Sequence, residues 1–194
     1  MKNNRCVLFS PSDACDLSLD PNTVNNNLIL SDDNKKVARG AEQDYPYHPE
    51  RFEVSYQVLC REGLTGRHYW EVEMSNGYKE DAAIGVAYKQ VVRKNDGNKF
   101  LGTNDMSWCF GVYAFKSKLF SAHNDKWWSG PLPSIGFKRV GVYLDWPGGT
   151  LSFYNVSSNK LSHFYTHTAK FAQPLYPGCY IHGETGSLFF CPVD

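Results

Sequence analysis

Few side chains in this sequence combine a reactive type with a workable spacing. Glu71 and Glu73 are two positions apart, so both carboxylates would lie on one face of a β-strand. A pair of carboxylates supplies the acid and base of most glycoside hydrolases, and this pair is the one hydrolase candidate that the sequence offers. The outward face of an antiparallel sheet is usually polar. We therefore interpret the pair as part of a solvated strand surface.

The histidines and cysteines do not have the spacing of metal ligands. His163 and His167 would share a face only on a helix, whereas their neighbours are strand-like. No two cysteines form a C-x-x-C pair, and most lie in apolar stretches. We expect no metal and no cofactor, and we expect reduced, mostly buried thiols that act as small hydrophobic side chains. The cysteines are Cys6, Cys15, Cys60, Cys109, Cys179 and Cys191.

Motifs of the common enzyme classes are absent from the sequence. The chain contains no G-x-S-x-G nucleophile elbow, no H-E-x-x-H zinc motif, no P-loop and no G-x-G-x-x-G turn. Because the carboxylate pair is a weak candidate, the absence of these motifs predicts a protein that is not an enzyme.

Charge and hydropathy limit the classes of partner. Twenty basic and twenty acidic residues give a net charge of zero, which supplies no overall attraction for nucleic acid or for an anionic membrane. No apolar run approaches the roughly 20 residues that span a bilayer, and residues 1–5 do not begin a signal peptide. We expect a cytoplasmic protein that binds no nucleic acid and inserts into no membrane.

The hydrophobic pattern is that of a β-sandwich or barrel. In residues 67–74, Trp70 and every second residue after it are apolar, which predicts a strand with Trp70 in the core. Residues 139–144 and 150–155 alternate likewise around a Pro-Gly-Gly turn and predict a hairpin. Further strands are expected at 27–30, 82–87, 108–113, 118–120, 161–165, 175–180 and 187–190.

The segments between these strands contain one short helical turn and three long loops. Ser10 followed by Pro11 is the start signal of a helical turn. The stretches 43–52, 89–99 and 121–138 are polar and long, so we expect them to form loops with variable surface chemistry. With 194 residues and no linker, the chain is expected to form one domain.

Adjacent tryptophans stand out within the last of these loops. Neighbouring residues on a strand point to opposite faces, so one of Trp127 and Trp128 is expected in the core and the other at the surface. An exposed tryptophan can stack on a sugar or anchor a peptide, but two rings that both cover a sheet edge are an equally good interpretation.

Three blocks of sequence, in order, resemble the PRY-SPRY (B30.2) domain. Residues 17–23 are similar to the L-D-P-x-T signature of the PRY segment, and 66–73 are similar to the G-x-x-Y-W-E-V strand of the SPRY segment. Residues 140–155 resemble the V-G-V-x-L-D and G-x-L-S-F-Y-N hairpin, and 190–192 resemble the usual L-C-P end. The resemblance is greatest to fish members of the family, which occur in tripartite-motif (TRIM) ubiquitin ligases, NOD-like receptors and stonustoxin-like proteins.

This resemblance implies a fold and a domain organisation. The fold is an all-β, bent antiparallel β-sandwich of the concanavalin-like jelly-roll type. Residues 1–12 would be a lead-in, 13–65 the PRY segment and 66–194 the SPRY segment of one compact domain. The domain would be the C-terminal part of a larger, oligomeric protein whose upstream regions drive assembly.

The resemblance also implies a function, namely recognition of a protein or peptide without catalysis. In a TRIM-type ligase of innate immunity the domain would select the target, while ubiquitin transfer would belong to a RING domain outside this chain. A lectin-like carbohydrate binder is the alternative, since β-sandwiches host both kinds of site.

Alternation along the expected strand at 108–113 predicts where the ligand binds. Trp108 is expected in the core, with Gly111 and Tyr113 on the opposite face. Some ligand-binding members carry two tryptophans where these two residues stand, and we expect Gly111 to leave a notch beside Tyr113 instead. The predicted partner-binding residues are Tyr88, Lys94, Asp96, Gly111, Tyr113, Phe115, Trp127, Trp128 and Glu184.

Overall fold

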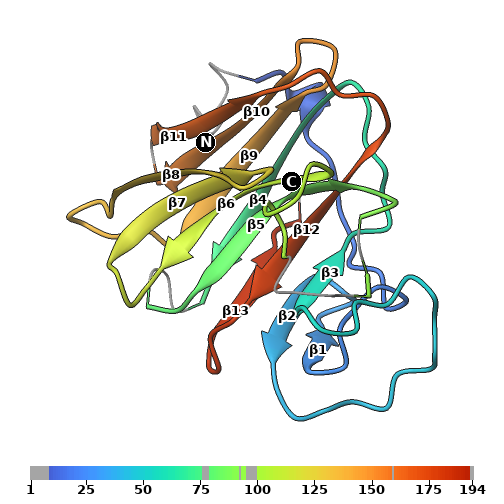
Figure 1. Cartoon of the computed structure of the whole chain (residues 1–194). Helices are drawn as coiled ribbons and strands as arrows, with labels where there is room; N and C mark the ends of the chain where they lie inside the picture. The colour runs from blue at the N-terminus through green and yellow to red at the C-terminus, as the bar shows by residue number, and fades with distance from the viewer. Residues whose placement is uncertain (1–8, 76–78, 92, 95–99, 159, 193–194) are drawn as a thin grey trace.

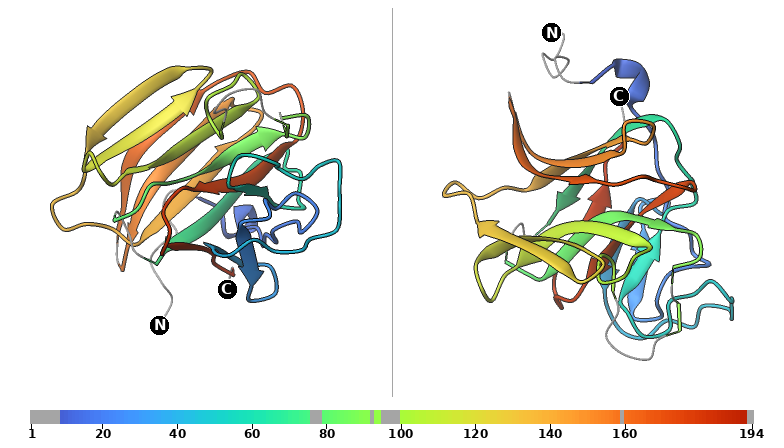
Figure 2. Two further views of the ribbon diagram at one scale, coloured as in Figure 1. Left: turned by 60° about the horizontal axis from the view of Figure 1, so that its bottom comes forward. Right: turned by 45° about the horizontal axis from the view of Figure 1, so that its top comes forward.

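Two antiparallel β-sheets stacked face to face form the protein (Figure 1). The computed structural model describes residues 9–75, 79–91, 93–94, 100–158 and 160–192. One sheet has the strand order β1-β2-β13-β4-β9-β10-β11 and the other has the order β3-β12-β5-β6-β7-β8. Two further views show the layers and the curved strands of a bent sandwich (Figure 2). The predicted fold class is confirmed.

The described residues form thirteen strands and one short 3-10 helix. Their bounds are η1 Pro11–Asp13, β1 Leu28–Ser31, β2 Lys36–Arg39, β3 Gln57–Leu59, β4 Arg67–Met74, β5 Ala82–Tyr88, β6 Ser107–Tyr113, β7 Lys118–His123, β8 Lys126–Pro131, β9 Arg139–Asp145, β10 Thr150–Ser157, β11 Lys160–Thr168, β12 Leu175–Ile181 and β13 Ser187–Phe190.

The main core lies between the two sheets, where every second side chain of each strand points inward. Trp70 on β4 is 2% exposed and Trp108 on β6 is 3% exposed, so both predicted core tryptophans are confirmed. Phe110 on β6 stacks on Phe153 on β10 with ring centroids 5.3 Å apart, which joins the two sheets. Of the five described cysteines, all free, Cys60, Cys109 and Cys179 are buried.

Most predicted elements are present, and the hairpin of β9 and β10 pairs around the predicted turn. The helical turn is also confirmed, because Ser10 and Asp13 cap η1 reciprocally. The strands β2, β3 and β8 were not predicted. The first two are only four and three residues long, and such short runs carry little periodic signal.

The prediction of one loop over residues 121–138 is wrong. Its first residues complete β7, and β8 pairs with β7 from Lys126 to Pro131. Asn124 and Asp125 form the connecting turn with φ of 50° and 57°, as a two-residue hairpin turn requires. Gly130 and Pro131 made β8 look like a loop in the sequence, because both residues are unfavourable inside a strand. Both are tolerated here because β8 is an edge strand.

Within the described residues, no helix has both the length and the apolar character needed to cross a membrane. The same residues contain no group of three or more histidine, cysteine, aspartate or glutamate side chains that could hold a metal ion.

Candidate functional site

The carboxylates of Glu71 and Glu73 are held by one arginine on the outer face of the seven-stranded sheet. Arg139 on β9 donates from Nη1 to Glu71 Oε2 at 3.0 Å and from Nη2 to Glu73 Oε2 at 2.9 Å. The hydrogen bond to Glu73 is the largest cause that raises the pKa of Arg139. Glu71 is only 8% exposed and also accepts from the Tyr69 hydroxyl at 2.9 Å. Glu71 is therefore not solvated as predicted, and both glutamates form structural salt bridges with Arg139.

A different surface lies on the outer face of the six-stranded sheet. Side chains that point away from the sandwich there form a second hydrophobic cluster, separate from the main core. Its buried members are Phe52, Leu59, Ala83, Ala87, Val91, Leu101, Cys109, Phe120 and Ala122, and its half-buried members include Tyr113 and Tyr180. Since the cluster has no second sheet above it, its half-buried rings meet solvent.

Aromatic rings on β6, β7 and β8 pack together in this cluster. Tyr113 stacks on Phe120 with centroids 4.3 Å apart. Trp127 lies 6.2 Å from Tyr113 and 5.7 Å from Phe120. Such pairs prefer centroid separations of roughly 4.5–7 Å, so the three rings form one continuous apolar surface at the β8 edge.

Phe100 extends this surface across the sheet. Its ring stacks on Tyr180 of β12 at 4.7 Å with an interplanar angle of 15°, and it meets Trp127 of β8 at 6.1 Å. The backbone amide of the next residue, Leu101, donates to the Gln57 side-chain oxygen on β3. We call Phe100, Tyr113, Phe120, Trp127 and Tyr180 the aromatic face.

The hydroxyl groups of the aromatic face stay neutral. Burial raises the pKa of Tyr180 to about 12, with a further contribution from Asp81, and burial is also the largest cause that raises the pKa of Tyr113. Both phenols therefore remain protonated hydrogen-bond donors at physiological pH. Lys116 lies 5.4 Å from the Tyr113 ring centroid at the margin. The face offers rings, neutral hydroxyls and a peripheral cation, and no carboxylate lies among its five residues.

Four of the predicted binding residues lie on or near this face. Tyr113 and Trp127 belong to it, and Trp127 is 46% exposed. Phe115, in the turn between β6 and β7, is 97% exposed. Glu184 is exposed in the loop between β12 and β13, two residues after His182, whose ring lies 6.2 Å from Tyr180.

Tyr88 and Trp128 lie on the opposite, inner face. The Tyr88 ring packs edge-on against Trp108 at 5.3 Å, and its hydroxyl accepts from the Ala172 amide. Trp128 packs against Tyr165 of β11 at 5.0 Å. Tyr88, a predicted binding residue, thus lies away from the aromatic face, because it continues the inward alternation of β5. Of the two tryptophans, Trp127 is the one at the surface.

The predicted notch at Gly111 does not exist. A Cβ atom at this position would lie 2.3 Å from the Ala82 carbonyl oxygen, 2.8 Å from Ala83 Cβ and 2.8 Å from Phe120 Cε1. The ring of Phe120 fills the space that alternation alone left open beside Tyr113. Gly111 therefore permits close packing of neighbouring strands and offers no pocket to a ligand.

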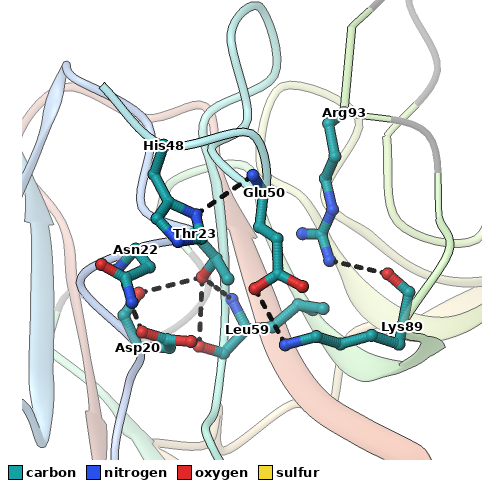
Figure 3. Close-up of polar contacts among 8 residues, drawn as sticks. All are labelled: Asp20, Asn22, Thr23, His48, Glu50, Leu59, Lys89 and Arg93. Carbon is teal, nitrogen blue, oxygen red and sulfur yellow. Dashed lines mark hydrogen bonds and ion pairs between the residues drawn. The ribbon is translucent and has the colours of Figure 1, made fainter. Parts of the chain in front are cut away.

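Lys94 belongs to a contact between the segment after β5 and residues 50–53. Its ammonium pairs with Glu53 at 3.2 Å, and Lys89 pairs with Glu50 at 2.9 Å (Figure 3). Arg93 donates to the Lys89 carbonyl at 3.0 Å, and its guanidinium lies over the Phe52 ring at 4.2 Å. Burial lowers the pKa of Arg93 to about 10. Asp96, the remaining predicted residue, lies outside the described residues.

Comparisons with known proteins match two consecutive segments of the chain. A family model described as SPRY-associated domain (PRY) matches residues 17–64, and one described as SPRY domain matches residues 67–193. Neoverrucotoxin subunit alpha of Synanceia verrucosa is 46% identical over 167 residues, which are 84% of this chain and 23% of that protein.

Two solved structures are similar over nearly the whole chain. The stonustoxin structure superposes with a TM-score of 0.84 at 40% identity and covers 92% of this chain and 29% of that chain. The TRIM65 PSpry domain superposes with a TM-score of 0.82 at 29% identity and covers 93% of this chain and 92% of that chain. The chain spans about a quarter of the length of the toxin subunits it matches.

Proposed function

The chain belongs to the PRY-SPRY family of recognition domains, and from this premise we propose that it binds a partner protein through the aromatic face. The family fold is a recognition domain and not a catalytic one. What remains to be proposed is which surface of this member binds and what it binds.

The observation that carries the proposal is the continuous set of five rings on a rigid sheet. Four strands and one loop supply these rings, and centroid separations from 4.3 to 6.2 Å join them. Aromatic residues held in place by a packed scaffold supply most of the energy at protein interfaces. Phe115 and Glu184 at the margin would adjust selection, as electrostatic and peripheral contacts usually do.

The parent protein is a second part of the proposal. The similarity to the TRIM65 PSpry domain supports a target-selecting C-terminal domain of a cytoplasmic TRIM-type ligase or another innate-immune protein, divided as 1–12, 13–65 and 66–194. In that setting this chain would be non-catalytic and upstream regions would oligomerise it. The toxin relatives support a stonustoxin-like parent as the other possibility.

The proposal is tested by affinity capture from a cell lysate on the immobilised domain. Tyr113→Ala and Trp127→Ala should each lose the proteins that the wild-type domain retains. Ile135→Ser is the matched control, since Ile135 is 98% exposed in the loop between β8 and β9. Equal capture by all four proteins would place the binding surface elsewhere. A glycan array run in parallel tests the lectin alternative, which glycan binding lost in Trp127→Ala would favour.

A further inference from the structure

We propose that the Phe100 ring, which lies between Tyr180 and Trp127, occupies a site for an aromatic side chain of the partner. When the partner binds, its own ring takes the place of Phe100 between these two residues. This inference rests on the proposed function and names the chemical class of the group that the face receives.

The position of Phe100 follows from strand order. Tyr180 on β12 and Trp127 on β8 are separated by β5, β6 and β7, which at a strand spacing of about 4.8 Å places their backbones about 19 Å apart. One ring, that of Phe100, nevertheless contacts both side chains, at 4.7 and 6.1 Å. Phe100 therefore lies over the middle of the face and joins Tyr180 to the ring of Trp127.

The strands beneath Phe100 have small outward side chains. Ala83 and Ala87 are the outward members of β5 in the second hydrophobic cluster, and Ala83 pairs across strands with Gly111 on β6. Larger side chains rise on both sides, from Tyr180 on one and from Phe120 and Trp127 on the other. The sheet thus leaves room for one aromatic ring between two aromatic walls, and Phe100 fills it.

The attachment of Phe100 allows its ring to leave without unfolding the segment. Its carbonyl oxygen accepts from the Thr103 amide at 3.0 Å and from the Thr103 hydroxyl at 2.8 Å. These hydrogen bonds and the Leu101 amide bond to Gln57 hold backbone atoms only. Rotation of the ring about χ1 breaks its two ring contacts and none of these bonds, and such rotations of partly exposed side chains are fast.

The walls select a neutral aromatic group. Phe100 has no polar side-chain atom, and the hydroxyls of Tyr113 and Tyr180 are held in the neutral form by burial. A charged side chain placed between these rings would lose hydration that the uncharged rings do not replace, because the charges that act on the face, Asp81 and Lys116, lie outside the five rings. A phenylalanine, tyrosine or tryptophan of the partner reproduces the contacts that Phe100 makes.

The test measures binding of a small aromatic probe by the full chain. The probe is N-acetyl-4-fluoro-L-phenylalaninamide, followed by fluorine NMR, with N-acetyl-L-leucinamide as the non-aromatic comparison. Phe100→Ala should bind the aromatic probe about tenfold more tightly than wild type, because an internal group that occupies a site for about 90% of the time lowers its apparent affinity by that factor. Adding Trp127→Ala to Phe100→Ala should abolish the gain, whereas Ile135→Ser, outside the aromatic face, should bind as wild type does.

Two results would overturn the inference. In one, Phe100→Ala binds the probe no more tightly than wild type while its melting temperature is unchanged. In the other, Phe100→Ala gains as much affinity for the leucinamide as for the aromatic probe, which would mean a non-selective apolar gap. Phe100→Leu, which retains apolar volume without a ring, guards against a folding defect and should show a smaller gain than Phe100→Ala.

Failure of this inference is distinguishable from failure of the proposed function. If capture of lysate proteins still depends on Tyr113 and Trp127 but is also lost in Phe100→Ala, then Phe100 is itself a contact residue. In that case only the proposed displacement of Phe100 by a partner ring is wrong. If capture is indifferent to Tyr113 and Trp127, the proposed function is wrong whatever the probe does.

Discussion

The outer faces of the two sheets differ in how their side chains are used. On the seven-stranded sheet, Arg139 forms an ion pair with each of the two carboxylates, and Phe9 stacks on Tyr69 at 4.7 Å and on Tyr143 at 4.2 Å. On the six-stranded sheet, the rings of the aromatic face contact one another and remain half exposed at its margin. We call the first the closed face, because Phe9 covers part of it, and the second the open face, because Trp127 is 46% exposed on it.

This difference shows that reactive residue types are a poor guide to function in this chain. The two carboxylates are the residues in the sequence that most resemble a catalytic site, more so than the aromatic residues. In the structure, however, both form ion pairs with Arg139. The aromatic face matches no catalytic motif and depends on ring packing alone. Binding energy at protein interfaces concentrates in a few residues, among which tryptophan and tyrosine are frequent, and this supports our proposal that the open face binds the partner.

The largest expected effect is loss of the core that supports both faces. Trp70→Ala should lower the free energy of unfolding by about 3–5 kcal/mol, because it removes buried apolar contacts and leaves a cavity. Urea denaturation measures this change. Trp127→Ala, on the open face, should cost much less. Equal losses for the two variants would show that Trp127 is a core residue. The distinction between Trp70 as a supporting residue and Trp127 as a binding residue would then be wrong.

The second effect concerns the polar link between the sheets. The Nε2 atom of His167 on β11 lies 2.7 Å from Ser121 Oγ and 3.1 Å from the Cys109 carbonyl oxygen, both on the six-stranded sheet. Burial lowers the pKa of His167 from 6.5 to about 4. The unfolded chain therefore binds the proton more tightly, and stability falls by about 3 kcal/mol as the pH drops from about 6.5 to about 4.

Thermal melting between pH 7 and pH 4 measures this dependence. In His167→Gln, the melting temperature should fall less steeply with decreasing pH than in wild type. The variant should also be less stable than wild type at neutral pH. His163→Gln, at an exposed position on the same strand, is the matched control and should melt with the slope of wild type. A wild-type slope retained in His167→Gln would assign the effect to other groups.

The third effect compares the two faces directly in binding. Tyr113→Ala on the open face should weaken the affinity for a captured partner by about 2 kcal/mol, as loss of an aromatic anchor does. Tyr143→Ala on the closed face should leave affinity unchanged. Calorimetric titration of both variants decides between them. A larger loss for Tyr143→Ala would reverse the assignment of open and closed faces.

The smallest effect tests the ion pair that closes the other face. Arg139→Met should lower stability by roughly 1–2 kcal/mol, because it removes the ion pair and hydrogen bond that Arg139 makes with the nearly buried Glu71 carboxylate. Adding Glu71→Gln should restore much of the loss, since the amide needs no counter-ion. If the double variant is no more stable than Arg139→Met in urea denaturation, the pairing with Glu71 is not what stabilises this face.

Alternation identified several residues of the candidate site without any structure. It placed Trp70 and Trp108 inside and Tyr113 outside, and the structure agrees. The same reasoning, applied to β7 and β12, points Phe120 and Tyr180 outward, so both residues were within reach of the sequence. Phe100 was not, because a loop residue belongs to no periodic pattern.

The sequence by itself determined most of the strands, their inward faces and the family, because side-chain alternation and the family motifs are local properties of the chain. Tertiary structure alone decided which outward residues meet. It filled the expected notch at Gly111 with Phe120, brought Arg139 to Glu71, and set Phe100 between Tyr180 and Trp127. These contacts join residues distant in the chain, and strand order, which no local pattern encodes, brings them together.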